Sequence, residues 1–506
     1  MKLKTYIFTA IMAVSMVGCL EKLPIDAIPA DKAINTVEEA DQFMIGIYSS
    51  FLSGSLYSGY LTLLPDLQTD FLYAVEGYTN VYGDIWRWDI HATNREITGV
   101  YGSLYNIIGQ CNFLLDKIES IEIWNLEVEE LDKLDQLRGE AYFARALCYS
   151  ELIKLFCKTY EGDEDAKNEL GVVLVTKYNG KEPIVRSSLY DSYQLVLSDL
   201  DNAARYLQLK KDYNPSTDGV LYSSPYFNEY VVYSLRSRVA LYMKDYEDAI
   251  LYSSKVIDSG YYSLSSASNI YTSGQTYYQY MWSHDLSTES IWQVGFTVNS
   301  YGSALGTIFF NYDFRSFKPD YVPAKWVLDL YVNGDNRYGA FFGEYQTGHT
   351  HGLTWPLLIK YWGNEEFLAL NILQTSQPKV FRLAEQYLIR AEAYANLPKP
   401  DFNKASADLS TLRESRFTSS GTISVNEKNA MDIIEEERVR ELYMEGFRLM
   451  DLKRWHKGFE RKPQSQTLEN GNHLIIEKDN PLFVWPIPQH ELESPGADIE
   501  PNESNK

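Results

Sequence analysis

The sequence has few of the residues from which common catalytic and metal sites are built. Its 506 residues include four cysteines and seven histidines. There is no nucleophile elbow, no phosphate-binding glycine loop, no His-Glu-x-x-His and no cysteine-based metal signature. Cys111, Cys148 and Cys157 are too few for a disulfide framework, and we expect buried free thiols. The sequence therefore favours a binding protein over an enzyme, with no cofactor and no metal.

Positive charge is also scarce. The chain has 46 Lys and Arg against 69 Asp and Glu, which gives a formal net charge of −23 at pH 7. Such a chain repels polyanions, so nucleic acid and an anionic membrane surface are not expected as partners. Hydrophobic residues still make up 45% of the chain, which predicts a packed core. The length suits two or three ordinary domains or one large platform built from repeats.

Long apolar runs are absent after residue 19, so no later segment is expected to span a bilayer, which needs roughly 20 residues. The apolar run Tyr6–Gly18 follows two lysines and fits the core of a signal peptide. It ends on Cys19 in a pattern that resembles the bacterial lipoprotein box, where the leader is cut before an acylated cysteine. We expect a signal peptide over 1–18 and a lipid-tethered linker over 19–35. The membrane is then contacted through the lipid alone.

Helical periodicity dominates the rest of the chain. Helices or helix pairs are predicted over 36–51, 131–156, 188–207, 230–260, 381–415 and 431–455. An Arg-x-x-x-Tyr motif recurs on first helices, as Arg145/Tyr149, Arg238/Tyr242 and Arg390/Tyr394. An Asp-aromatic-x-x-Ala motif opens second helices at Asp245 and Asp401. Small residues that face an alanine are typical of tetratricopeptide pairs, so we predict an all-α scaffold of such pairs.

Aromatic residues are abundant, with 40 Tyr, 22 Phe and 10 Trp. Their densest clusters lie in two loop-rich insertions, at about 64–98 and 263–378. Tyr and Trp combine a flat apolar face with a polar group, which suits both helix packing and the recognition of polar ligands. Candidate ligand-binding residues are Asp66, Asp70, Tyr78, Tyr82, Trp86 and Trp88 in the first insertion, Tyr280 and Trp282 in the second, and Arg382 at the start of the next helix.

Each candidate also has a structural interpretation. The aromatic side chains can pack against helices, and Arg382 can form an ion pair at a helix start. Trp86 and Trp88 lie two residues apart, so in an extended segment both would face one side. Within the predicted helix 431–455, Glu436 can pair with Arg440 and Glu445 with Arg448. We interpret that block as structural ion pairing rather than catalysis.

Several motifs coincide in a recognisable order. They are the lipoprotein box, "LRGEAYFARALCYSELIKLF", "RVALYMKDYEDAILYSSKVI", "FRLAEQYLIRAEAYANL", "ERVRELYMEGFRLMDLKRW" and "WPIPQHEL". The set resembles the SusD/RagB family of Bacteroidetes outer-membrane lipoproteins. The resemblance implies one SusD-like domain over 36–490, with a C-terminal tail over 491–506. It also implies a ligand site built by the inserted loops.

The same resemblance implies a function. We expect a protein that captures oligosaccharide or polysaccharide at the outer membrane, facing the cell exterior, without catalysis. The implied partner is a SusC-like TonB-dependent transporter, for which the lipoprotein acts as a lid. Three other hypotheses stay open: peptide capture by a RagB-like member, a surface glycosidase, and a repeat scaffold that binds only other proteins.

Overall fold

The computed structural model describes most of the chain. The described residues are 33–75, 80–178, 180, 183–312, 315–348, 354–421, 423–462 and 473–506. The predicted leader, Cys19 and the candidate Tyr78 lie outside them. Within these ranges, no helix combines the length and the apolar character needed to cross a membrane.

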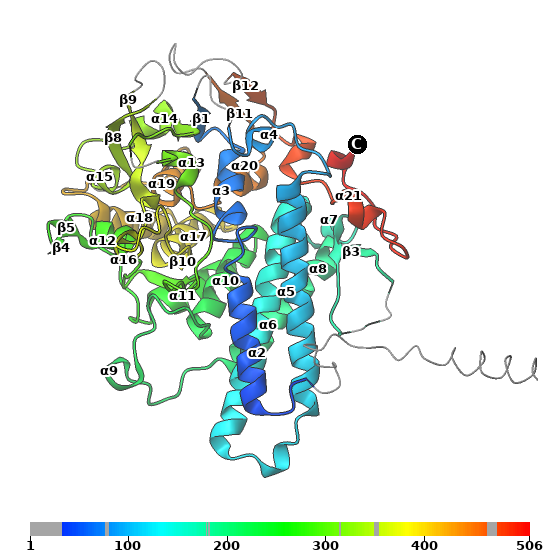
Figure 1. Ribbon diagram of the computed structural model, residues 1–506. Coiled ribbons are helices and arrows are strands. Elements are labelled where there is room, and N and C mark those ends of the chain that lie inside the picture. Colours follow the sequence, from blue (N-terminus) through cyan, green and yellow to red (C-terminus); the bar gives the residue numbers. More distant parts are fainter. Residues whose placement is uncertain are drawn as a thin grey trace, which may run out of the picture.

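Long helices form the N-terminal part of the scaffold. They are α2 (Val37–Ser50), α5 (Arg95–Ser120), α6 (Val128–Phe156) and α8 (Leu189–Tyr206). In Figure 1, α2, α5 and α6 run alongside one another as one long bundle. The predicted cap of α2 is present, because Thr36 accepts the N–H of Glu39 at 3.1 Å. Cys111, Cys148 and Cys157 are buried free thiols, as predicted.

Two helix pairs continue the scaffold where the repeats predict them. They are α10 (Glu229–Tyr242) with α11 (Tyr246–Ile257), and α17 (Leu383–Asn396) with α18 (Phe402–Arg416). The alanines of the repeated motif, Ala249 and Ala405, are fully buried. Their small side chains let the paired helices approach closely. The prediction of an all-α fold built from tetratricopeptide-like pairs is confirmed.

The repeated arginine of each first helix forms a two-pronged ion pair with a neighbouring helix. The pairs are Arg145–Asp199 (2.7 and 2.7 Å), Arg238–Glu385 (2.6 and 2.7 Å) and Arg390–Asp408 (2.9 and 2.7 Å). A guanidinium that binds both carboxylate oxygens fixes orientation as well as distance. The repeated arginines therefore set how one helix sits against the next.

The insertions consist of short helices and two-stranded antiparallel sheets. The first insertion holds α3 (Tyr60–Leu67), β1 (Leu72–Ala74) and α4 (Gly83–Trp86). The second holds β4 (Ile270–Thr272), β5 (Gln275–Thr276), α12 (Tyr277–His284), β6 (Ser290–Gln293), α13 (Thr307–Phe310), β7 (Tyr321–Pro323), α14 (Lys325–Asp329), α15 (Arg337–Phe341), β8 (Phe342–Gln346), β9 (Thr354–Leu358), η3 (Ile359–Tyr361) and α16 (Glu365–Leu368). The insertions are joined because β1 pairs with β7.

The remaining elements are short connections and the C-terminal part. Connections between the helices are η2 (Ile123–Asn125), α7 (Asp163–Ala166), β2 (Leu170–Val173), β3 (Arg186–Ser188) and α9 (Pro215–Asp218). After the second insertion come β10 (Lys379–Arg382), α19 (Ala430–Leu442), α20 (Arg448–Arg454), β11 (Phe459–Arg461), β12 (Leu474–Ile476), η4 (Pro481–Phe483), α21 (Gln489–Leu492) and η5 (Glu503–Asn505). Strand β10 pairs with β6, β2 with β3, β4 with β5, β8 with β9, and β11 with β12.

The C-terminal residues pack against the helical body. The side-chain amide of Asn502 donates to the carbonyl oxygens of Phe156 and Trp485, both at 2.9 Å. Arg186 also donates to the carbonyl of Glu500 at 3.0 Å. In Figure 1 the C-terminus accordingly lies beside α21 and the helical body.

The predicted single helix over 431–455 is wrong. Helix α19 ends at Leu442 and α20 begins at Arg448, while Met444 and Gly446 between them have φ values of 59° and 85°. The carboxylate of Asp66 accepts the backbone N–H of Gly446 at 3.0 Å and of Arg448 at 2.8 Å, which satisfies the start of α20. Because the helix is broken between them, Glu445 and Arg448 do not pair with each other.

The predicted pairing of Glu436 with Arg440 is confirmed, because Arg440 Nη1 lies 3.4 Å from a carboxylate oxygen of Glu436. Both residues belong to α19, so their i,i+4 spacing is preserved.

Replacing Gly446 with alanine tests the break. A Cβ there would overlap the carbonyl oxygen of Leu61, and the left-handed φ disfavours any side chain. We expect Gly446→Ala to lower the free energy of unfolding by about 1–3 kcal/mol in urea titrations. The control, Gly109→Ala inside α5, meets no atom within 4 Å and should raise it by up to about 1 kcal/mol. Wild-type stability of Gly446→Ala would contradict the argument.

Candidate functional site

A cluster of buried charges joins the second insertion to the C-terminal helices. Its members have almost fully buried side chains and include as many carboxylates as cations. They are Glu289, Asp335, Arg337, Lys360, Arg382, Arg416, Glu437, Arg440, Glu441 and Glu445. Burying a charge is expensive unless an opposite charge and hydrogen bonds compensate it. This buried charge cluster therefore holds only if every member stays paired.

The candidate Arg382 lies inside the cluster. Its guanidinium donates to Glu289 at 2.7 Å, to Glu441 at 2.9 Å and to Glu445 at 2.7 and 2.8 Å. Only 1% of the side chain is exposed. The structural interpretation, an ion pair at a helix start, is the one that the structure shows.

The cluster shifts the pKa values of its carboxyl groups. Burial alone would raise the pKa of Glu437, but Arg337 and Arg440 lower it to about 2. Burial opposes ionisation of Glu441 as well, yet Arg416 and Arg382 hold its pKa well below the usual range. Both groups are therefore carboxylates at neutral pH.

The two candidate aspartates of the first insertion, Asp66 and Asp70, make structural contacts. Asp66 is fully buried, and burial raises its pKa to about 7 even though it accepts two backbone N–H groups. Asp70 pairs with Arg448, with both nitrogen–oxygen distances at 3.1 Å. Both side chains connect the first insertion to the start of α20.

The expectation that Trp86 and Trp88 share one face of an extended segment is wrong. Trp86 ends the short helix α4, and Trp88 has a φ of 62°. Trp86 donates to the carbonyl of Leu72 at 3.1 Å, and Trp88 to that of Gln68 at 2.5 Å. Trp86 and Trp88 are 2% and 7% exposed, so neither ring offers a free face.

The remaining candidate of the first insertion, Tyr82, is half-buried at the start of α4. Its ring meets that of Tyr60 edge-on at 5.5 Å. Burial is the largest cause that raises the pKa of Tyr82 to about 12.

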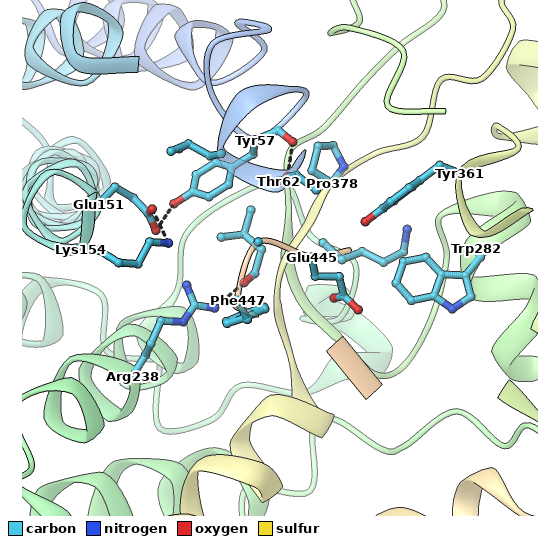
Figure 2. Close-up of a pocket in the computed structure, with 14 residues that line it drawn as sticks. Tyr57, Thr62, Glu151, Lys154, Arg238, Trp282, Tyr361, Pro378, Glu445 and Phe447 are labelled. Carbon is cyan, nitrogen blue, oxygen red and sulfur yellow. Dashed lines mark hydrogen bonds and ion pairs between the residues drawn. The ribbon is translucent and has the colours of Figure 1, made fainter. Parts of the chain in front are cut away.

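An internal cavity lies between helices α6 and α10 of the scaffold and the second insertion (Figure 2). Tyr57 and Lys154 both point toward Glu151, at 3.2 and 2.5 Å. Arg238 and the candidate Trp282 also line the space. The free volume of about 20 Å³ suits a single water molecule rather than a sugar.

Surface hollows large enough for a small ligand surround α12. Three of them, of about 380, 440 and 450 Å³, are each lined by side chains of α12 or by the residue before it. Helix α12 starts with a complete capping box between Thr276 and Gln279. Its inner face carries Tyr278 and Trp282, which contact the buried charge cluster through Arg416 and Lys360.

The outer face of α12 carries an exposed group of tyrosines. Tyr271 of β4 lies 4.8 Å from Tyr277 and 4.7 Å from Tyr280, measured between ring centroids. Tyr280 stacks on His284 at 3.9 Å with only 9° between the rings. Tyr271 and Tyr277 are 48% and 45% exposed. The three tyrosines thus form an aromatic surface that solvent reaches.

Hydroxyl and amide groups complete this site, which we name the tyrosine hollow. Besides the three tyrosines, its lining consists of Tyr222, Ser263, Leu264, Ser265, Ser266, Asn269, Leu286, Ser287 and Thr288. Its volume of about 380 Å³ lies within the range of small-ligand sites. Aromatic faces beside hydroxyl groups can stack on a sugar ring and bind its hydroxyls.

The structure separates the two candidates of the second insertion. Tyr280 lines the tyrosine hollow, whereas Trp282 lies on the floor of the 450 Å³ hollow and against Lys360. Sequence reasoning missed Tyr271 and Tyr277. The signal that could have found them is the tyrosine-rich stretch 271–280, with serines on both sides.

Comparisons with known proteins agree with this fold. The SusD family model matches residues 266–497, and a second family model, described as "starch-binding associating with outer membrane", matches residues 20–241. A comparison with curated protein sequences found no match. The two models match consecutive parts of the chain, and it belongs to the SusD/RagB family.

Solved structures with the same fold come from Bacteroides. A SusD superfamily protein of Bacteroides thetaiotaomicron is 24% identical, with a TM-score of 0.77 and coverage of 92% of this chain and 99% of that one. A SusD-like carbohydrate binding protein of Bacteroides vulgatus is 17% identical (TM-score 0.71, coverage 92% and 98%). Surface glycan-binding protein A of Bacteroides fluxus is 19% identical (TM-score 0.67, coverage 92% and 99%).

The buried charge cluster predicts acid sensitivity. The pKa of Glu437 is about 2 in the folded chain and about 4.5 when unperturbed, so the unfolded chain takes up a proton first as the pH falls. The stabilisation from this carboxylate is complete above pH 4.5 and is lost as the pH falls toward 2. Urea titrations at stepped pH should show this loss.

Glu437→Gln separates this effect from general acid unfolding. It should lower stability at pH 7 by about 3–5 kcal/mol, because Arg337 and Arg440 lose a charged partner, and should flatten the acid dependence. Glu164→Gln, whose side chain is 90% exposed, is the matched control and should change neither. An unchanged acid dependence in Glu437→Gln would rule out this assignment.

Proposed function

We propose that this chain is a non-enzymatic lipoprotein of the outer membrane that binds oligosaccharide or polysaccharide and delivers it to a TonB-dependent transporter. The tyrosine hollow is the observation that carries the proposal. It presents three tyrosine rings and several hydroxyl groups at the surface, beside a helix whose inner face packs against the buried charge cluster. Sugar rings combine apolar C–H faces with hydroxyl groups, and this surface complements both.

The names of similar proteins support a carbohydrate ligand. One family model carries the words "starch-binding", and two of the similar solved structures are named for carbohydrate or glycan binding. The same family description refers to association with the outer membrane. These names belong to the relatives, and the proposal extends them to this chain because the fold is shared over nearly its whole length.

The lining of the tyrosine hollow also bears on catalysis. Glycoside hydrolysis generally uses two carboxyl groups that flank the scissile bond. Among the described residues, the hollow is lined by hydroxyl, amide, aromatic and aliphatic side chains and by no Asp or Glu. This composition favours capture over cleavage.

Membrane tethering rests on the sequence, and the transporter partner rests on the resemblance to the SusD/RagB lipoproteins. The apolar leader ends on Cys19, and several acyl chains on one residue hold a soluble domain on a bilayer, at about 0.8 kcal/mol per buried CH₂. A binding platform held at the membrane can pass its ligand to a neighbouring pore. The exterior is the face on which such a protein meets large glycans.

Removing an exposed tyrosine tests the glycan site. We expect Tyr277→Ala and Tyr271→Ala each to weaken binding of a retained glycan about tenfold, because each removes a stacking face. Affinity gels and calorimetry measure the change, and far-UV circular dichroism should be unaltered. Trp124→Ala, at a 76% exposed aromatic residue in η2, is the control and should bind as wild type. Full binding by both tyrosine variants would place the site elsewhere.

Replacing Cys19 tests the tether. We expect Cys19→Ser to abolish incorporation of labelled palmitate and to move the protein from the membrane fraction to a soluble fraction, because the acyl chains provide the attachment. Cys111→Ser, which alters a buried thiol, should leave the labelling in place. Labelling of Cys19→Ser would disprove acylation at this residue.

A further inference from the structure

The charge around α12 restricts the class of glycan. Among the residues that the structure describes, no Lys, Arg, Asp or Glu lines the tyrosine hollow. The 450 Å³ hollow on the other side of α12 has one charged lining residue, Glu365, beside Gln275, Gln279 and Ser283. A glycan that passes from the tyrosine hollow across α12 to the 450 Å³ hollow therefore meets neutral polar groups and one carboxylate.

The negative charge of Glu365 is fixed in place. Its carboxylate accepts the side-chain amide of Gln275 at 3.1 Å and lies 3.3 Å from Nε2 of His284. The neighbouring Glu366 is also exposed. Both carboxylates act on Tyr280 and help to raise the pKa of its hydroxyl, after the larger effect of burial. The surface next to Tyr280, at the edge of the tyrosine hollow, is therefore acidic.

Cations lie beneath α12, but they are already bound. Lys360 pairs with Glu445 at 2.6 Å, and Lys379 pairs with Asp285 at 2.7 Å. Arg382 and Arg416 belong to the buried charge cluster. All four side chains are at most 1% exposed, so a carboxylate or sulfate on a sugar cannot reach them.

We infer that the ligand of this site is an uncharged glycan, and that polyuronates and sulfated glycans are rejected. The inference rests on the proposed function and adds the substrate class. Carboxylates and sulfates need Arg, Lys or clustered N–H donors to replace the water that they lose. Here an anionic sugar would lose water, gain no cation and be repelled by Glu365 and by the net charge of −23. Sugar hydroxyls meet Ser, Thr, Asn and Gln instead.

Native affinity gels test the inference at pH 7.5 and low ionic strength. The neutral probes are amylopectin, galactomannan, arabinoxylan and a mixed-linkage β-glucan, and the anionic probes are polygalacturonate, hyaluronan and chondroitin sulfate. We expect retardation by at least one neutral glycan, lost in Tyr277→Ala, and by no anionic one. The carboxymethylated form of the retained glycan should bind at least tenfold more weakly than the unmodified form.

A charge reversal locates the cause of the discrimination. Glu365→Lys should raise the affinity for the carboxymethylated glycan roughly fivefold, because the side-chain charge changes by two units and replaces repulsion with attraction at about 8 Å in water. The affinity for the unmodified glycan is measured in the same variant, and the gain should remain when the two affinities are expressed as a ratio. Glu164→Lys, a distant change in α7, makes the same change in net charge and should alter neither affinity. No gain in Glu365→Lys would refute the role of the acidic surface next to Tyr280.

The outcomes separate this inference from the proposed function. Retardation by an anionic glycan that is lost in Tyr277→Ala would confirm the site and overturn the substrate class. Retardation by a neutral glycan that is unchanged in Tyr277→Ala would keep glycan binding and overturn the inference, because another surface would then select the ligand. Retardation by none of the probes would count against both.

Discussion

The requirement that every buried charge be paired governs this structure. Ten ionic side chains meet between the second insertion and the C-terminal helices, and Arg382 alone contacts three carboxylates. Such a cluster tolerates little displacement, because an unpaired member would lie in a medium of low dielectric constant. It therefore fixes the loop-rich insertion, which has few long elements of its own, against the helical scaffold.

The tyrosine hollow depends on that constraint through α12. Tyr278 donates to Glu441 at 3.2 Å and holds the inner face of the helix against the cluster. Trp282 lies one turn further along the same face, while Tyr280 and His284 form the corresponding pair on the outer face. Residues two apart on a helix differ by about 200°. This is why Tyr280 is at the surface and Trp282 in the core, although the sequence presents them as neighbours.

Local patterns in the sequence predict the helical scaffold. Contacts between residues far apart in the chain determine where the last helix breaks and which candidate residues are buried. The repeated Arg-x-x-x-Tyr and the buried alanines are encoded within single helix pairs, so the fold class could be predicted. The break at Gly446 depends on the backbone of Leu61 and the carboxylate of Asp66, which no local pattern reveals. The same holds for Trp86, whose burial follows from partners as distant as Arg461. Of the three tyrosines on the outer face of α12 and on β4, only Tyr280 is predicted from the sequence.

The separation of these partners along the chain has a consequence for how the protein is made. The carboxylate of Asp66 binds the backbone of Gly446, which follows 380 residues later, and Arg382 has only Glu289 of its three carboxylate partners until Glu441 and Glu445 have been synthesised. Contacts of such separation form late and slowly. A nascent chain therefore stays incompletely folded until almost its whole length has emerged.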